Sequence, residues 1–213
     1  MKQKPTIEAL QQEENFELIA EVEHVQIKEF VIEQMLHDRK LIPAFMIYQL
    51  LMVLLGTFFL TRAIVLAFRG FPLPLLVSAG TLVFCFTLLI VIHELLHGAA
   101  LKITGAPKIT YGGWLKKFMF YAEADQHVLN RPQFFLVAFT PLVVVQLITL
   151  AGVVIWVSHP AVYFFLILMS VHSLFCAGDI GLASIFFRFP GRNVFTYDNR
   201  EAKKSYYFVE KQR

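Results

Sequence analysis

The chain has 213 residues, of which 57% are hydrophobic and 16% charged, and its net charge is +3. Soluble domains are about 45–50% apolar and about 25% charged, so this composition excludes a soluble globular domain, a disordered chain and a disulfide-rich scaffold. The small net charge gives no indication of a nucleic-acid partner. We therefore predict an all-α integral membrane protein whose first partner is the lipid bilayer.

Residues 1–40 form the only long polar stretch of the sequence. They hold five basic and nine acidic residues, a local net charge of −4. Apolar residues recur within them at spacings of three and four, which is typical of amphipathic helices. Two interpretations remain open for this N-terminal region: one or two amphipathic helices packed on the rest of the protein, or a solvated arm.

Four predominantly apolar segments follow, at residues 42–61, 73–92, 133–157 and 161–187. Each is long enough to cross a hydrocarbon core of about 30 Å as a helix that rises about 1.5 Å per residue. They predict a membrane domain of four spans over residues 41–187, followed by a basic tail over residues 188–213. Cys85 and Cys176 lie inside these apolar segments and are expected to pack there rather than to form a disulfide.

The distribution of Lys and Arg predicts the orientation. The N-terminal region holds five, the first loop two, the second loop five, the third loop none and the tail seven. An arrangement with both termini inside places 17 of these residues in the cytosol and two outside. Because cytoplasmic loops carry the excess of Lys and Arg, we expect a multi-pass protein with cytosolic N- and C-termini.

The second loop, residues 102–132, has an aromatic segment at residues 117–124 that follows a turn sequence at Tyr111-Gly112-Gly113. One interpretation is a short β-hairpin, whose exposed edge would accept a peptide as an added strand. The other is a set of aromatic anchors at the membrane interface. The sequence does not decide between them.

The clearest chemical signal is His93-Glu94-Leu95-Leu96-His97, at the end of the second apolar segment. Residues four apart lie on one face of a helix, so both imidazoles can bind one Zn²⁺ at about 2.0–2.1 Å. Glu94 would then act as the general base on water. Ionisable residues within a membrane segment indicate function by default, and a metal ion would offset their cost.

A catalytic zinc site usually has three protein ligands, so a third is needed. Asp179 is the only acidic residue between Asp125 and Asp198. Counted from the same end of their spans, His93 and Asp179 fall within about one helical turn of each other in depth. Asp179 is the predicted third ligand. The alternative third ligand lies in the second loop, from the group Glu123, Asp125 and His127.

His172 lies seven residues before Asp179, which is two turns along one helix. We consider two roles for it near the metal: a hydrogen-bond partner of the metal site or a stabiliser of an oxyanion. A histidine that only packs in the core is equally consistent with the sequence.

The His93-Glu94-Leu95-Leu96-His97-Gly98 core, with Gly178-Asp179 in a later span, resembles site-2 proteases, which are intramembrane zinc metalloproteases. It resembles more closely a group of small bacterial membrane proteins described as "putative zincin peptidases". The segment from Asn130 to Leu142 also resembles the site-2 protease segment after the metal helix, so the resemblance covers roughly residues 80–187. It departs from site-2 proteases near Asp179, where the usual prolines are missing and His172 stands near the position of an asparagine. An inserted PDZ-like domain is also missing.

Together the motif and the resemblance imply a zinc metalloprotease in a bacterial cell membrane. His93, His97 and Asp179 would bind zinc, Glu94 would be the catalytic base, and the substrate would be a peptide or a membrane protein. The alternative is a non-catalytic membrane protein whose intramembrane His and Asp residues form a metal-ion or proton path. The sequence leaves the oligomeric state open.

Overall fold

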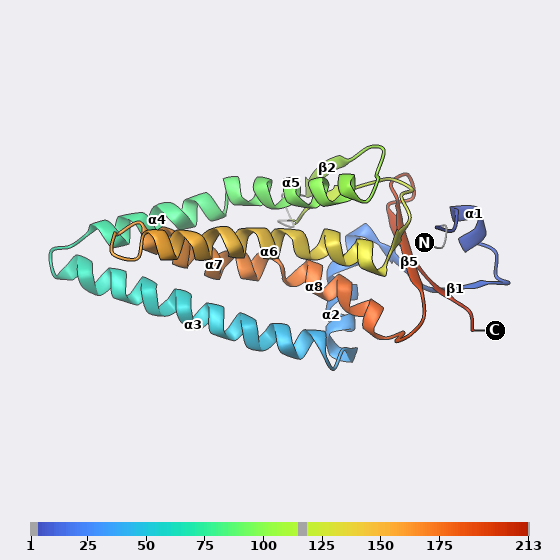
Figure 1. The fold of residues 1–213 in the computed structure, drawn as a ribbon, viewed down its shortest axis with the longest axis horizontal. Coiled ribbons are helices and arrows are strands. Elements are labelled where there is room, and N and C mark those ends of the chain that lie inside the picture. Colours follow the sequence, from blue (N-terminus) through green and yellow to red (C-terminus); the bar gives the residue numbers. More distant parts are fainter. Residues whose placement is uncertain (1–3, 115–118, 213) are drawn as a thin grey trace. The chain divides into compact units, whose positions relative to one another are not determined.

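The computed structural model of the protein describes residues 4–114 and 119–212. The chain forms two compact units. The first, here called the sheet unit, consists of Met1–Ile42, Glu94–Ala138 and Gly178–Arg213. The second, the helical unit, consists of Pro43–His93 and Phe139–Ala177. Figure 1 gives the order of the elements along the chain.

The long helices follow the apolar segments closely. Helix α3 covers Leu41–Phe68 and α6 covers Arg131–Ile155. The second apolar segment becomes two helices, α4 at Leu73–Cys85 and α5 at Leu88–Ile103, which meet at an angle of 48°. The fourth is divided into α7 at Val162–Phe175, α8 at Ala177–Ser184 and the 3₁₀ helix η3 at Ile185–Phe187.

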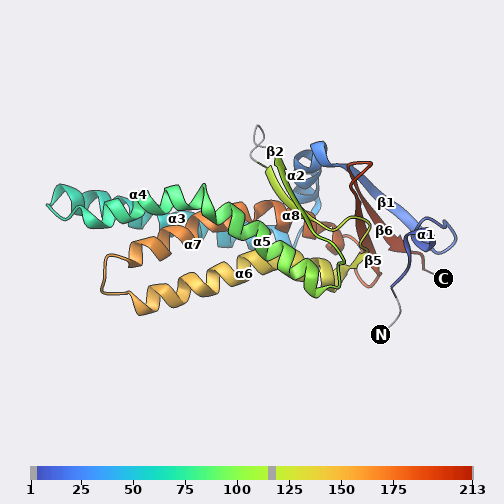
Figure 2. The same ribbon diagram turned by 90° about the horizontal axis from the view of Figure 1, so that it is seen from above.

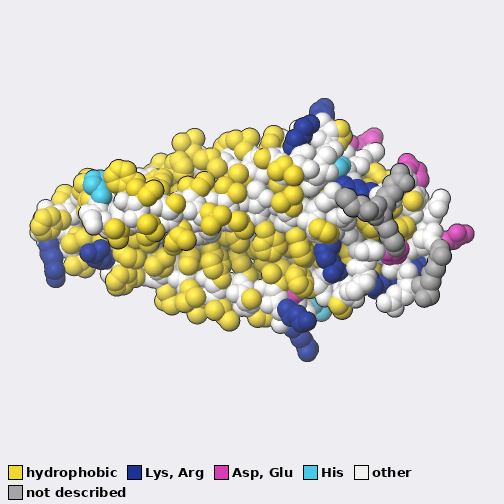
Figure 3. Space-filling view, viewed as in Figure 1, with side chains coloured by type: hydrophobic (Ala, Val, Ile, Leu, Met, Phe, Trp, Pro, Cys, Tyr) yellow, Lys and Arg dark blue, Asp and Glu magenta, His cyan; other side chains and the backbone are white. Residues whose placement is uncertain are grey.

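Three of the helical segments, Leu41–Phe68, Arg131–Ile155 and Val162–Phe187, are long and apolar enough to cross a membrane. The bent pair α4–α5 makes a fourth if it forms one span. Hydrophobic side chains cover most of the visible face of the helical unit in Figure 3. Many of them are largely exposed on α3, for example Leu50, Leu54 and Phe58. Such a large exposed apolar surface is typical of a protein that contacts lipid or another apolar partner.

Helix α3 continues past the predicted end of the first span and includes Arg62. The guanidinium of Arg62 donates a hydrogen bond of 2.7 Å to the Tyr163 hydroxyl, and its carbon lies 5.8 Å from the centre of that ring. Tyr163 and Ala63 belong to a buried apolar cluster of the helical unit. The charge that marked the boundary in the sequence is therefore accommodated by a partner within the helical unit.

The sheet unit corrects the all-α prediction. It contains a four-stranded antiparallel sheet in the order β1-β6-β5-β4. The strands are β1 at Phe16–Glu23, β4 at Leu129–Asn130, β5 at Val194–Asn199 and β6 at Lys204–Glu210. Figure 2 shows β1, β6 and β5 side by side. The remaining short elements of this unit are α1 at Ile7–Leu10 and the 3₁₀ helix η1 at His24–Gln26.

The amphipathic-helix interpretation of residues 1–40 is wrong for β1 and right for α2 at Ile27–His37. Glu17, Glu21 and Glu23 are exposed along β1, whereas Val22 is buried. Glu21 and Glu23 are two residues apart and so lie on one face of the strand, whereas a register shift between Leu18 and Ala20 separates them from Glu17. The basic tail forms the β5–β6 hairpin, and β6 pairs with β1, so the two ends of the chain share one sheet.

The sheet is held by an apolar core that includes the end of the last helical segment. Phe186 of η3 is fully buried, and it clusters with Val22, Val194, Tyr207 and Val209 of the strands. Ile185 belongs to the same core. Because α8 leads directly into η3, this packing fixes the C-terminal end of α8 on the sheet, and α8 carries Asp179.

Of the two interpretations of the second loop, the structure supports the β-hairpin. Strand β2 at Thr110–Trp114 pairs antiparallel with β3 at Met119–Glu123. Lys117 and Phe118, which we assigned to the aromatic segment of this loop, lie outside the described residues. Tyr111 of β2 lies against Gly98 of α5, where a methyl group on Gly98 would overlap the Tyr111 hydroxyl. The hairpin is therefore in contact with the helix that carries the histidine motif.

Candidate metal centre

Helix α5 presents the two histidines of the motif on one face. His93 and His97 are buried, with exposed fractions of 6% and 8%, while Leu95 between them is 51% exposed. Since four residues complete about one turn, His93 lies one turn before His97 along the same side of α5. Glu94 is partly buried. Leu95 is thus exposed on the outer face of α5, and the two imidazoles are buried on the opposite face.

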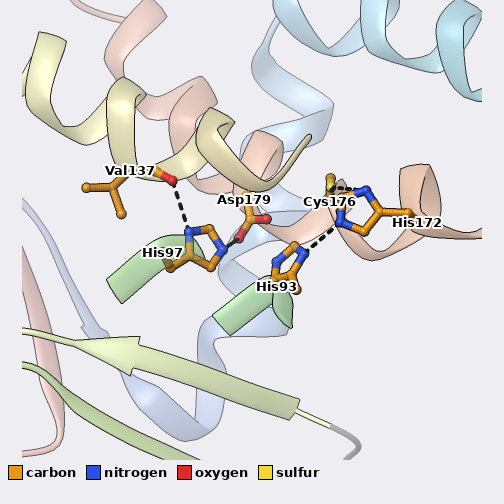
Figure 4. Close-up of polar contacts among 6 residues, drawn as sticks. All are labelled: His93, His97, Val137, His172, Cys176 and Asp179. Atoms are coloured by element: carbon orange, nitrogen blue, oxygen red, sulfur yellow. Dashed lines mark hydrogen bonds and ion pairs between the residues drawn. The ribbon is translucent and has the colours of Figure 1, made fainter. Parts of the chain in front are cut away.

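Within the sheet unit, the ring of His97 lies between a backbone carbonyl and a carboxylate (Figure 4). His97 Nδ1 lies 2.9 Å from the Val137 carbonyl oxygen, and His97 Nε2 lies 3.3 Å from Asp179 Oδ1. A carbonyl oxygen can only accept a hydrogen bond, so Nδ1 carries the hydrogen. In the neutral ring, Nε2 then has a lone pair that points toward the carboxylate.

A lone pair and a carboxylate oxygen at this distance require a cation between or upon them. A proton on Nε2 would form a charge-assisted hydrogen bond, for which about 2.7–2.9 Å is usual. Two ligands of a tetrahedral zinc ion, each bound at about 2.0–2.1 Å, are about 3.3–3.4 Å apart. The observed 3.3 Å is an ordinary ion-pair distance and also equals the separation of two zinc ligands. The residues present therefore fit a zinc ion.

Within the helical unit, His93 has a different surrounding. His93 Nδ1 lies 3.1 Å from Nε2 of His172, and the Cys176 sulfur lies 3.8 Å from His172 Nδ1 and 3.9 Å from its Nε2. His172, on the last turn of α7, and Cys176, the residue that caps this helix, are fully buried. The contact with His172 thus involves the Nδ1 atom of His93. The expected proximity of His172 to the motif is thus observed at His93.

His172 and Asp179 do not share one helix as the seven-residue spacing suggested. Helix α7 ends at Phe175, Cys176 caps it, and α8 begins at Ala177. His172 lies in the helical unit, and Asp179 is the third residue of α8 in the sheet unit.

The alternative third ligands in the second loop each have a protein partner. Glu123 Oε1 lies 3.2 Å from Arg200 Nε, and Asp125 Oδ1 accepts a hydrogen bond of 2.8 Å from the Arg200 backbone N–H. His127 Nε2 lies 3.1 Å from the Thr104 hydroxyl oxygen. Among residues 4–114 and 119–212, these three belong to no group of three close metal-binding side chains.

Burial determines the electrostatics of this loop. The pKa of Glu123 is raised mainly by burial and further by the negative charge of Asp198, against the lowering effect of His24 and Arg200. Burial also raises the pKa of Asp198, although its Oδ1 accepts a hydrogen bond of 2.6 Å from the Ser205 hydroxyl. The pKa of His127 is lowered by burial and by Lys4.

Three contributors to these surroundings were not identified from the sequence. The Val137 carbonyl is a backbone group and leaves no trace in a side-chain pattern. Tyr111 was noticed only as part of a turn. Cys176 was interpreted as a packing residue, although it follows His172 by four residues, the spacing that brings two side chains to one helix face.

The helical segments and the imidazole–carboxylate pair define a class of protein: a mostly helical protein with three or four candidate membrane-spanning helices and a candidate metal site. Residues 86–194 match the family described as "Putative zincin peptidase", and the chain belongs to this family. The matched region includes the whole histidine motif and Asp179. No curated protein and no solved structure gives a significant match to the chain.

Proposed function

We propose that the protein is a membrane-embedded zinc metallopeptidase that hydrolyses peptide bonds of membrane-associated substrates. The observation that carries the proposal is the His97–Asp179 contact of 3.3 Å, with His97 Nδ1 held by the Val137 carbonyl. Histidines that bind a metal usually donate their other ring N–H to a carbonyl or carboxylate. His97 has this arrangement on a motif that also supplies His93 and Glu94.

His93, His97 and Asp179 are the proposed zinc ligands. Bound there, zinc supplies a Lewis acid that polarises a carbonyl group and makes water more acidic. Glu94 takes a proton from the attacking water and returns it to the leaving amine. His172 accepts a hydrogen bond from His93 Nδ1, which holds the ring with Nε2 toward the metal; the distance of 3.1 Å supports this role.

The substrate is proposed to be an extended segment of a peptide or membrane protein. A helix satisfies its own backbone hydrogen bonds, so its scissile bond must be drawn into an extended form before it can be attacked. The β2–β3 hairpin forms a two-stranded sheet and contacts α5 through Tyr111 and Gly98. A substrate strand added to this hairpin would therefore run beside the motif.

The proposed location is a bacterial cell membrane, with both termini in the cytosol. The three or four helices that are apolar enough to span a membrane support insertion. The excess of Lys and Arg in the N-terminal region, the second loop and the tail supports the orientation.

The test uses the full chain, purified in a mild detergent without chelator. We expect about one zinc ion per chain by mass spectrometry and cleavage of a model membrane substrate. Glu94→Gln should abolish cleavage and keep the zinc, because an amide cannot take up the proton. The matched control is Glu123→Gln, the same change in the second loop, which should keep both the cleavage activity and the bound zinc. Cleavage by Glu94→Gln at the wild-type rate would exclude Glu94 as the base.

A second candidate is the metal-ion or proton path, which the buried His93–His172 contact favours. In that case, ion flux into proteoliposomes would continue in Glu94→Gln and fall in His172→Leu. Zinc-dependent cleavage without flux would exclude the path.

A further inference from the structure

A second group of metal-binding side chains lies wholly within the helical unit. One ligand atom from each of His93, His172 and Cys176 lies within 4.8 Å of the other two. All three side chains are buried, with exposed fractions of 6%, 0% and 0%. The group differs from the proposed zinc ligands because it contains a sulfur atom and no carboxylate.

Two helices bring the group together. His172, on the last turn of α7, and Cys176, its C-cap residue, are four residues apart, so their side chains lie on the same side. His93 comes from α5 and contacts His172 through its Nδ1 (Figure 4). The group thus combines two imidazoles and a thiol that are fixed by secondary structure.

The distances within the group are close to those of a coordinated metal ion. Metal bonds of about 2.0–2.1 Å to nitrogen and about 2.3 Å to sulfur place two nitrogens about 3.4 Å apart and a nitrogen and a sulfur about 3.6 Å apart. The structure has 3.1 Å between the two imidazole nitrogens and 3.9 Å between the sulfur and His172 Nε2. These two distances thus differ by about 0.3 Å from those of a coordinated ion, and the His93 and Cys176 ligand atoms lie within 4.8 Å of each other.

The donors and their surroundings select the kind of ion. Thiolate ligands favour soft ions such as Cu⁺. Binding of Cu⁺ releases the proton of the Cys176 thiol, so one positive charge replaces another and the group stays neutral. A divalent ion would leave a net positive charge among apolar helices, which is costly.

We propose that Cys176, His172 and His93 form a binding site for a soft monovalent metal ion, Cu⁺. The site itself does not depend on the proposed peptidase function. One consequence does rest on that function: Cu⁺ at His93 Nδ1 would replace the hydrogen bond to His172 that holds His93 as a zinc ligand.

The experiment titrates the full chain in detergent with Cu⁺, without oxygen and with a competing chelator, followed by X-ray absorption at the copper edge. We expect one Cu⁺ per chain with one sulfur and two nitrogen neighbours. Cys176→Ser should remove the sulfur signal and weaken Cu⁺ binding more than about 100-fold, since a hydroxyl is a poor ligand for soft ions. The matched control is Cys85→Ser, the other fully buried cysteine, which should keep the signal.

The wild-type spectrum alone can overturn the proposal: no sulfur neighbour at saturating Cu⁺ would mean that the three side chains only hydrogen-bond. Loss of the signal in Cys85→Ser and not in Cys176→Ser would also overturn it. His97→Ala tests whether the copper site is independent of the zinc site. This variant should lose the zinc site and keep the copper–sulfur signal unchanged. Failure of the peptidase proposal is seen separately, in the zinc content and cleavage of the copper-free protein.

Discussion

Two groups of ionisable side chains in the sheet unit differ in what their carboxylates face. Asp179 faces the Nε2 of His97, a ring whose Nδ1 is held by a backbone carbonyl. Glu123 and Asp125 instead face the guanidinium and the backbone N–H of Arg200. The first group has two electron-pair donors directed at each other and can hold a metal ion. In the second, a guanidinium and a backbone N–H already contact the carboxylates.

The difference shows why the kind of residue does not define a metal site. Both groups contain a carboxylate, and a histidine, His97 or His127, lies in or near each. Only in the first does the hydrogen bond on one ring nitrogen direct the other nitrogen toward a carboxylate. A group is a candidate for metal binding when a hydrogen bond at one imidazole nitrogen leaves the other nitrogen facing a carboxylate.

The largest effect is expected when a carboxylate of the first group is removed. Asp179→Ala should weaken zinc binding by more than about 100-fold, because loss of a mere hydrogen-bond partner of a ligand already costs about 10–100-fold. Zinc affinity measured by chelator competition checks this. Asp125→Asn is the matched control and should bind zinc as the wild type does. If Asp179→Ala binds zinc as tightly as the wild type does, the third ligand is a residue other than Asp179.

A smaller effect tests whether the metal site extends to His172. A glutamine can accept the hydrogen bond from His93 Nδ1, whereas a leucine cannot. We expect His172→Leu to weaken zinc binding by about 10–100-fold and His172→Gln to recover much of that loss. Both variants alter the packing of the helices, so similar affinities in the two would indicate a purely structural role for His172.

Much of the helical architecture and the core of the site follow from local sequence. The apolar segments predicted α3 and α6 because lipid-crossing length and hydrophobicity are properties of consecutive residues. The motif placed His93, Glu94 and His97 together because one helical turn relates them. Asp179 was found because it is the one acid in a long stretch of sequence.

The rest depends on contacts between distant segments. Strand β1 pairs with β6, where Glu17 faces Val209, and no local pattern encodes a partner so far along the chain. Leu18, Ile19 and Ala20 are consecutive apolar residues at the point where the register shifts, so they obscured the alternation of the strand. The Val137 carbonyl that sets the His97 ring has no signature in the sequence.

The hairpin that connects the two groups gives a third prediction. Gly98 follows His97, and a methyl group there would overlap Tyr111 of β2, whose strand partner β3 ends with Glu123. Overpacking costs about 1–3 kcal/mol, and the gain of about 1 kcal/mol from alanine in a helix offsets part of it. Because the overlapping atoms lie at the end of the half-exposed Tyr111 side chain, we expect Gly98→Ala to lower the free energy of unfolding by at most about 2 kcal/mol.

Thermal unfolding in detergent checks this, with two controls. Gly178→Ala on α8 has open space around the added methyl group and should be neutral or slightly stabilising. In a Tyr111→Ala background, Gly98→Ala should no longer destabilise. If the loss persists in that background, the overlap with Tyr111 is not its cause.

The smallest effect concerns the second group and pH. Burial raises the pKa of Glu123, so the folded protein holds this proton more tightly than the unfolded chain does. The resulting contribution to stability is complete below the unfolded pKa of about 4.3 and is lost as the pH rises through the raised folded value. Above that value, ionised Glu123 destabilises the fold, and Glu123→Gln removes this destabilisation.

The melting temperature of this variant should therefore exceed that of the wild type at pH 8 and approach or fall below it at pH 4. A melting-temperature difference between the two proteins that does not change with pH would show that the Arg200 ion pair, rather than burial, dominates the energetics of Glu123.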